Sequence, residues 1–216
     1  MHLDIFSDTI CPWCYVGKRR LARALALRPQ PKMAVRWRAF QLNPGMPSDG
    51  MARESYIDAK FGSAERAKRI YEAVTAVGAS EGIEFNFNSI RRTPNTLLSH
   101  RLLRKAGREG LQDLLLEALF RAYFIDGRDV GSARVLAEIG ETVGLADTAA
   151  FLAGQEDSEE VRAEDSLARR QGINGVPCFI FNYRFLLSGA QEPESFFQLF
   201  DLAREEEAGV LRESAG

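Results

Sequence analysis

Two cysteines separated by two residues, in Cys11-Pro12-Trp13-Cys14, constrain this chain more than any other feature. They follow a short apolar run over residues 3–6 and open a segment whose apolar spacing predicts a helix over residues 11–27. One helical turn separates the two sulfur atoms, so they can close a disulfide with acceptable geometry. The free N–H groups at a helix start favour a thiolate on the first cysteine. The pattern therefore predicts a redox-active pair at the beginning of a helix.

The composition favours a globular protein from a reducing compartment. The 216 residues are 45% hydrophobic and 27% charged, which allows a sizeable core without disulfide support. Lys and Arg number 28 against 30 Asp and Glu, so we expect no nucleic-acid partner. The start of the chain lacks the basic and long apolar segments of a signal peptide, and no apolar run approaches the roughly 20 residues of a membrane helix. We expect a cytoplasmic protein with no membrane partner.

Cysteine usage supports catalysis over structure. The chain has only one further cysteine, Cys178, and three cysteines are too few for the disulfide framework of a secreted protein. A zinc site needs about four ligands. The remaining candidates, Cys178, His2 and His100, offer no second paired spacing, so we expect no metal.

The predicted elements run β-α-β, then a block of helices, then β-β-α. Apolar alternation and turn residues predict strands over residues 2–7, 33–42, 177–182 and 185–188. The first two strands flank a helix and are expected to be parallel. Residues 51–171 are mostly helical in pattern, and a last helix is expected over about 193–206.

This order predicts an α/β protein with a thioredoxin-type sheet. The sheet and its helices are expected from residues 1–43 and 172–216. Residues 44–171 are expected to form a helical insertion subdomain that packs over one side of the dithiol.

Position along the helix assigns a role to each residue of the motif. Cys11, exposed at the helix start, is the expected nucleophile, and Cys14 the more buried resolving thiol. Pro12 fits the first helical turn because it lacks only an N–H that would be free anyway. Trp13 offers an apolar surface beside the sulfur atoms, where we expect substrate to bind.

Motifs along nearly the whole chain carry a family resemblance. In chain order they are Ser7-Asp8-Thr9-Ile10-Cys11-Pro12-Trp13-Cys14-Tyr15-Val16-Gly17, Trp37-Arg38-Ala39-Phe40-Gln41-Leu42-Asn43-Pro44, Asn95-Thr96, His100-Arg101-Leu102, Leu119-Phe120-Arg121-Ala122-Tyr123-Phe124, Gly175-Val176-Pro177, Phe179-Ile180-Phe181 and Ser188-Gly189-Ala190-Gln191. The chain resembles the DsbA family in its FrnE-like branch, which is related to 2-hydroxychromene-2-carboxylate isomerases and kappa-class glutathione transferases. The resemblance implies a thioredoxin-like fold with a large helical insertion, and thiol-disulfide oxidoreductase chemistry.

The same resemblance implies a role for Val176 and Pro177. A proline at a strand entry is ordinary by itself, because it only removes one donor from the ladder. In thioredoxin-like proteins the matching proline is cis and packs against the disulfide. We therefore expect a cis Val176–Pro177 bond, with the backbone of Val176 turned outward to pair with an extended substrate.

One difference from the relatives directs the functional prediction. The isomerase and transferase relatives have serine where this chain has Cys11, and use it to hold and activate glutathione. The cysteine pair favours a disulfide reductase or isomerase that acts on a disulfide-containing protein or a low-molecular-weight thiol. No cofactor is expected, although glutathione could serve as co-substrate, and many relatives form homodimers. The alternative is a glutathione-dependent isomerase or transferase of a small aromatic or polyketide-like molecule.

Three further residues have two readings each. Asp8 could take the proton of the resolving cysteine, or it could be a loop or capping residue. His100 could be a general base or a hydrogen-bonded structural histidine. Cys178 could be a third redox thiol or a small buried hydrophobic residue.

Overall fold

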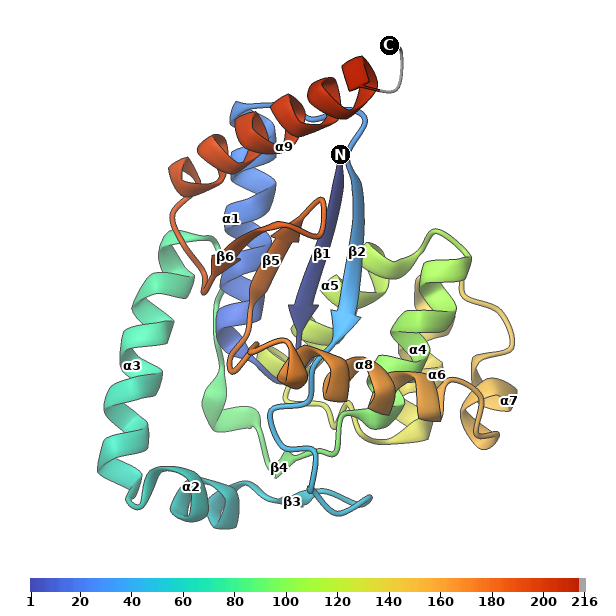
Figure 1. The fold of residues 1–216 in the computed structure, drawn as a ribbon. Helices are drawn as coiled ribbons and strands as arrows, with labels where there is room; N and C mark the ends of the chain where they lie inside the picture. The colour runs from blue at the N-terminus through green and yellow to red at the C-terminus, as the bar shows by residue number, and fades with distance from the viewer. Residues whose placement is uncertain (214–216) are drawn as a thin grey trace.

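The computed structural model describes residues 1–213, with a four-stranded mixed sheet at the centre of the molecule (Figure 1). In spatial order the strands are β2 (Ala34–Ala39), β1 (His2–Ser7), β5 (Cys178–Phe181) and β6 (Phe185–Ser188). β1 and β2 are parallel, as predicted, and β5 is antiparallel to both of its neighbours. The two ends of the chain therefore build one sheet.

Helices α1 (Pro12–Leu27) and α9 (Glu194–Glu213) cover one face of this sheet (Figure 1). Successive strand residues point to opposite faces, so Phe179 and Phe181 of β5 both point toward these helices. Their rings meet Phe196 and Phe200 of α9 at centroid distances of 5.0 and 5.8 Å. Helix α9 runs seven residues beyond the predicted end at 206.

Helix α8 (Ser158–Arg170) covers the opposite face. A smaller apolar cluster lies there, formed by Phe6, Phe40, Ala168, Ile173 and Cys178. The alternation within β5 thus divides its side chains between two separate packing layers.

The predicted block of helices lies between β2 and β5 in the sequence. It contains β3 (Met51–Ala52), α2 (Arg53–Phe61), α3 (Ala64–Ser80), a 3-10 turn η1 (Phe87–Ser89), β4 (Arg92–Thr93), α4 (Leu97–Arg108), α5 (Gln112–Phe124), α6 (Ala133–Thr142), α7 (Thr148–Ala153) and α8. Helices α4, α5 and α8 contact β2, whereas α3 packs beside α1 (Figure 1). Among the described residues, no helix is both long and apolar enough to cross a membrane.

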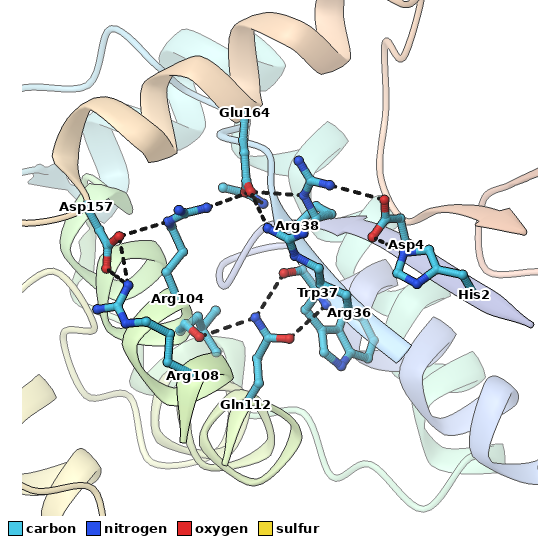
Figure 2. Close-up of polar contacts among 12 residues, drawn as sticks. His2, Asp4, Arg36, Trp37, Arg38, Arg104, Arg108, Gln112, Asp157 and Glu164 are labelled. Atoms are coloured by element: carbon cyan, nitrogen blue, oxygen red, sulfur yellow. Dashed lines mark hydrogen bonds and ion pairs between the residues drawn. The ribbon is translucent and has the colours of Figure 1, made fainter. Parts of the chain in front are cut away.

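Side chains from this block cover the free edge of β2. The backbone groups of alternate β2 residues bond to β1, so the N–H and C=O groups of residues 35, 37 and 39 point away from β1, toward the edge of the sheet. Gln112 of α5 accepts from the Trp37 N–H at 2.9 Å and donates to the Trp37 carbonyl at 3.0 Å (Figure 2). Glu164 of α8 accepts from the Ala39 N–H at 3.0 Å. These bonds replace those of a neighbouring strand and protect the edge from pairing with another chain.

Glu164 also joins the helices to the sheet electrostatically. Figure 2 shows its carboxylate facing three guanidinium groups, at 3.4 Å from Arg36, 3.0 Å from Arg38 and 2.7 Å from Arg104. Arg38 also contacts Asp4 of β1 at 3.1 Å. One buried carboxylate therefore links β2, α4 and α8.

Candidate active site

The dithiol lies at the start of α1, directly after the loop that leaves β1. Cys11 holds the N-cap position with extended backbone angles, φ −92° and ψ 112°, and Pro12 begins the helix. The Cys11 carbonyl accepts from the N–H groups of Cys14 and Tyr15 at 3.0 and 3.4 Å. Pro12 fits here because the first helical N–H has no intrahelical acceptor. Both cysteines are free thiols, so the structure corresponds to the reduced pair.

The two cysteines differ in their access to solvent. Cys14 is fully buried, whereas Cys11 retains 4% of its surface, less than the exposed nucleophile that we expected. Burial raises the pKa of Cys14 well above its ordinary value, and the neighbouring Cys11 raises it further. The Ser7 hydroxyl and the backbone of Asp8 oppose this effect in part. Cys14 is therefore held as a neutral thiol at neutral pH.

Val176 and Pro177 lie against the dithiol. The Cys11 sulfur is 3.5 Å from the Val176 carbonyl oxygen, and the Val176–Pro177 peptide bond is cis. Gly17 allows this contact, because a Cβ at position 17 would lie 2.9 Å from Pro177 Cγ. The sequence analysis did not identify Gly17 as a site residue. Its place inside a predicted helix, where glycine is unfavourable, could have indicated it.

Trp13 and helix α2 form the surroundings of the nucleophile. Trp13, which stands between the two cysteines in the sequence, is 38% exposed. Burial raises the pKa of Tyr56; Asn43 and Arg53 oppose this effect, and the nearby Asp8 and Cys11 add to it. Tyr56, Asn43 and Lys60 line a pocket of about 330 Å³, together with Gly45, Met46, Pro47, Met51 and Ala59. Tyr56 was missed because its helix is remote in sequence and carries no motif.

Asp8 and His100 are both buried beside the dithiol loop. The carboxylate of Asp8 accepts from the Leu42 N–H at 2.7 Å through one oxygen, and the other lies 3.3 Å from His100 Nε2. His100, on α4, is 3% exposed. The structure thus brings together two residues that are 92 positions apart in the sequence.

Cys178 lies on the other side of the sheet from the dithiol. It packs with Phe6 and Ala168 under α8, and burial raises its pKa to about 11. This environment favours the reading of Cys178 as a small buried hydrophobic residue.

A family model for the DSBA-like thioredoxin domain matches residues 2–201. The chain belongs to the DSBA-like thioredoxin family. The fold is therefore thioredoxin-like, with a large helical insertion, as the sequence motifs predicted.

Solved structures of known proteins agree with the membership in the DSBA-like family. A probable DsbA oxidoreductase from Streptomyces coelicolor is 35% identical, with a TM-score of 0.86 over 95% of this chain and 91% of that one. The cytosolic disulfide reductase DsbM from Pseudomonas aeruginosa, solved with GSH, is 20% identical, with a TM-score of 0.63 over 98% of this chain and 100% of that one. A 2-hydroxychromene-2-carboxylate isomerase is 16% identical, with a TM-score of 0.65 over 100% of this chain and 98% of that one. The last two likenesses concern the fold alone.

Proposed function

We propose that this chain catalyses thiol-disulfide exchange, with Cys11 as nucleophile and Cys14 as resolving thiol. The observation that carries this proposal is the 3.5 Å approach of the Cys11 sulfur to the Val176 carbonyl, with Cys14 buried beneath. A substrate strand that pairs with the Val176 backbone would bring its own disulfide next to Cys11. Pro12, Trp13 and Pro177 would supply the apolar walls of this contact.

The reaction proceeds in two balanced steps. The Cys11 thiolate attacks one sulfur of the substrate disulfide, which forms a mixed disulfide and releases one substrate thiolate. Cys14 then loses its proton and attacks the Cys11 sulfur, which releases the second thiolate and closes the Cys11–Cys14 disulfide. Two electrons pass from the protein to the substrate, so an external thiol must reduce the pair for turnover.

We infer that the substrate is a protein disulfide or a small disulfide in the cytoplasm, and that glutathione supplies the electrons. The likeness to a cytosolic disulfide reductase solved with GSH supports this direction. The same likeness favours a reductase or isomerase over an oxidase. A homodimer stays a prediction.

The second candidate is a glutathione-dependent isomerase acting on a small aromatic molecule. The likeness to a 2-hydroxychromene-2-carboxylate isomerase is consistent with it. The pocket lined by Asn43, Tyr56 and Lys60 has a volume within the usual range for small ligands. In this mechanism Cys14 is dispensable, because glutathione itself does the chemistry.

Reduction of insulin disulfides with glutathione as reductant tests the proposal. Cys11→Ser should abolish turnover, and Cys14→Ser should accumulate a mixed disulfide that is visible by mass spectrometry without reductant. Losing the intramolecular thiol should slow resolution on the order of 100-fold or more, because its high effective concentration is lost. Cys178→Ser is the matched control and should keep activity. Full activity in Cys11→Ser would end the proposal, whereas turnover of aromatic substrates in Cys14→Ser would favour the isomerase.

A further inference from the structure

The side chains that cover the edge of β2 leave the first half of this strand open. Gln112 bonds both backbone groups of Trp37, and Glu164 accepts from the Ala39 N–H. The N–H and C=O of Val35 also point toward the edge, and among the described residues no group bonds to either of them. Val35 itself is 39% exposed. An unpaired donor and acceptor on an edge strand are a template for pairing with another chain.

A groove of about 770 Å³ lies along this open part of the edge. One of its walls is apolar and is formed by Leu21, Ala22, Leu25, Val35 and Trp37. Val35 pairs with Leu3 of β1, which is buried in the core beneath α1. Paired residues of neighbouring strands point to the same face of a sheet, so this wall lies on the α1 side. Apolar side chains of an added strand could pack there.

The other wall of the groove is cationic. Arg36 follows Val35 and therefore points to the opposite face of the sheet. The groove is lined on that face by the carboxylate of Glu164 and by three arginines, Arg36, Arg104 and Arg108 (Figure 2). The Glu164 side chain is only 8% exposed, whereas those of Arg36 and Arg108 are 51% and 48% exposed. Arg36 shares Glu164, at 3.4 Å, with two other arginines. Positive charge on this wall favours acidic side chains.

Strand β1 already shows which sequence complements β2. Its residues Leu3-Asp4-Ile5 pair with residues 35–37, so two apolar residues flank an acidic one. The two apolar residues lie in the core on the α1 side, and the Asp4 carboxylate contacts Arg38 at 3.1 Å on the other side. A second copy of β2 would instead bring Arg36 and Arg38 against their own counterparts, and facing like charges are destabilising. A strand that alternates apolar and acidic residues therefore fits the open side of β2.

We propose that the open half of β2 binds an extended segment of a partner protein, in which apolar and acidic residues alternate, as an added strand. The segment backbone accepts a hydrogen bond from the Val35 N–H and donates one to the Val35 carbonyl. Its apolar side chains pack against Leu21 and Leu25, and its carboxylates face Arg36. Gln112 ends the added strand at Trp37. This inference goes beyond thiol-disulfide exchange and needs neither cysteine of the dithiol.

Fluorescence anisotropy of a short labelled peptide tests this surface. The probe is Leu-Asp-Ile-Asp-Leu, amidated at its carboxyl end and labelled at its amino end with a zwitterionic rhodamine. Its pattern is the same in either strand direction. The first control peptide has the same composition in the order Leu-Leu-Ile-Asp-Asp, and the second has lysine in place of aspartate. The third is the probe with N-methyl groups on its three central residues, which removes their donors and keeps their side chains.

Two protein variants address the two contacts separately. Val35→Pro removes the proposed donor, and proline is tolerated in an edge strand where the N–H faces outward. Arg36→Glu reverses the charge on the cationic wall. The matched control is Arg134→Glu, which makes the same charge change on α6 at a side chain that is 80% exposed and lies outside the groove.

The probe should bind saturably, and each control peptide should bind at least about tenfold more weakly. Val35→Pro should weaken the probe roughly tenfold, and Arg36→Glu should make the lysine peptide the better ligand. Arg134→Glu should change the affinity by less than about twofold. The proposal fails if the probe does not saturate up to about 1 mM, or if the N-methylated peptide binds as well as the probe. The comparison of the four peptides uses the unaltered protein, so it decides the matter even if a variant does not fold.

Sedimentation equilibrium distinguishes the partner segment from a second copy of the chain. A dimer that Val35→Pro converts to a monomer would assign the edge to self-association and overturn the proposal. The peptide contains no sulfur, so its binding is independent of insulin reduction. Loss of the redox activity with intact peptide binding would contradict the proposed function alone, and the reverse result would contradict the docking surface alone.

Discussion

The free edge of β2 and the dithiol belong to the same sheet, but their buried polar groups differ. At the β2 edge, Gln112 satisfies both backbone groups of Trp37, and Glu164 binds three arginines and a backbone N–H. Around the dithiol the pattern is the reverse. Four of the five partnerless buried side-chain atoms found in the described residues belong to Ser7, Asp8, Asn43 and His100. A fully bonded network specifies structure, whereas unmet hydrogen-bonding capacity marks where chemistry or ligand can enter.

The hollows in these two regions support the same distinction. The groove beside β2 is the larger, at about 770 Å³, and is lined by Leu21, Leu25, Val35 and Trp37 between ion-paired side chains. The pocket at Tyr56 is less than half that size, but it holds the tyrosine whose pKa is raised in part by Asp8 and Cys11. A functional site chosen by volume alone would therefore be the groove beside β2, where side chains join the helices to the sheet.

Glu164→Gln should produce the largest stability change outside the dithiol. The amide cannot pair with three guanidinium groups, although Arg38 and Arg104 keep a second carboxylate each. Because Glu164 is only 8% exposed at its side chain, we expect a loss of about 3 kcal/mol in the free energy of unfolding. Chemical denaturation measures this, and turnover per folded molecule should change by less than about twofold.

The matched control for Glu164 is Glu159→Gln on the same helix. Its ion pair with Arg162 is solvent-exposed, so it should cost less than about 0.5 kcal/mol. Equal effects of the two substitutions would show that the β2-edge network contributes no special stability. A large loss of turnover in folded Glu164→Gln would show that the β2-edge network also supports catalysis at the dithiol.

Gly17→Ala should affect both stability and turnover, because Gly17 touches Pro177. A Cβ there would lie 2.9 Å from Pro177 Cγ and 3.3 Å from Phe179 Cζ, so the strand or the helix must move. We expect a loss of about 1–3 kcal/mol in unfolding free energy. A displaced Val176 should also slow insulin reduction roughly tenfold, since small misplacements of reacting groups are costly.

Gly209→Ala provides the comparison for Gly17, since it is a helical glycine with nothing within 4 Å of an added Cβ. It should stabilise the protein by roughly 0.5–1 kcal/mol and leave turnover unchanged. Unchanged stability and turnover in Gly17→Ala would mean that the approach of α1 to Pro177 is not needed for function.

The fold could be predicted because its signals are local. The apolar alternation of β1 and β5, the helix at Pro12–Leu27 and the proline at the strand entry all lie within short stretches. The boundaries were less accurate. β2 ends at Ala39, because the Phe40 N–H makes the last backbone bond to β1, at Ser7, and the next N–H on that side, that of Leu42, bonds to the Asp8 carboxylate. That side-chain acceptor lies 34 residues away and leaves no local pattern.

The candidate site could be predicted in part for the same reason. Cys11, Cys14, Val176 and Pro177 belong to recognisable motifs, and the structure brings them together. Tyr56 reaches the site through tertiary packing of the insertion. Asp8 and His100 were noted individually, but their 3.3 Å contact depends on how α4 docks against the loop after β1, which no spacing encodes.

The third cysteine offers the smallest test of the contrast, because Cys178 lies in the layer under α8 and has no proposed chemistry. Burial raises its pKa in the folded protein from about 9 to about 11. The unfolded chain then loses this proton first as pH rises, so the associated stability is present below pH 9 and is lost between 9 and 11. Between pH 9 and 10 the reduced protein should lose about 1 kcal/mol more than Cys178→Ala does, measured by denaturant unfolding at each pH. Cys14 adds a loss of the same sign in both proteins and cancels in the difference. If the free energies of unfolding of the two proteins change in parallel with pH, Cys178 is deprotonated as readily in the folded state as in the unfolded chain. Such a result would indicate a reactive thiol.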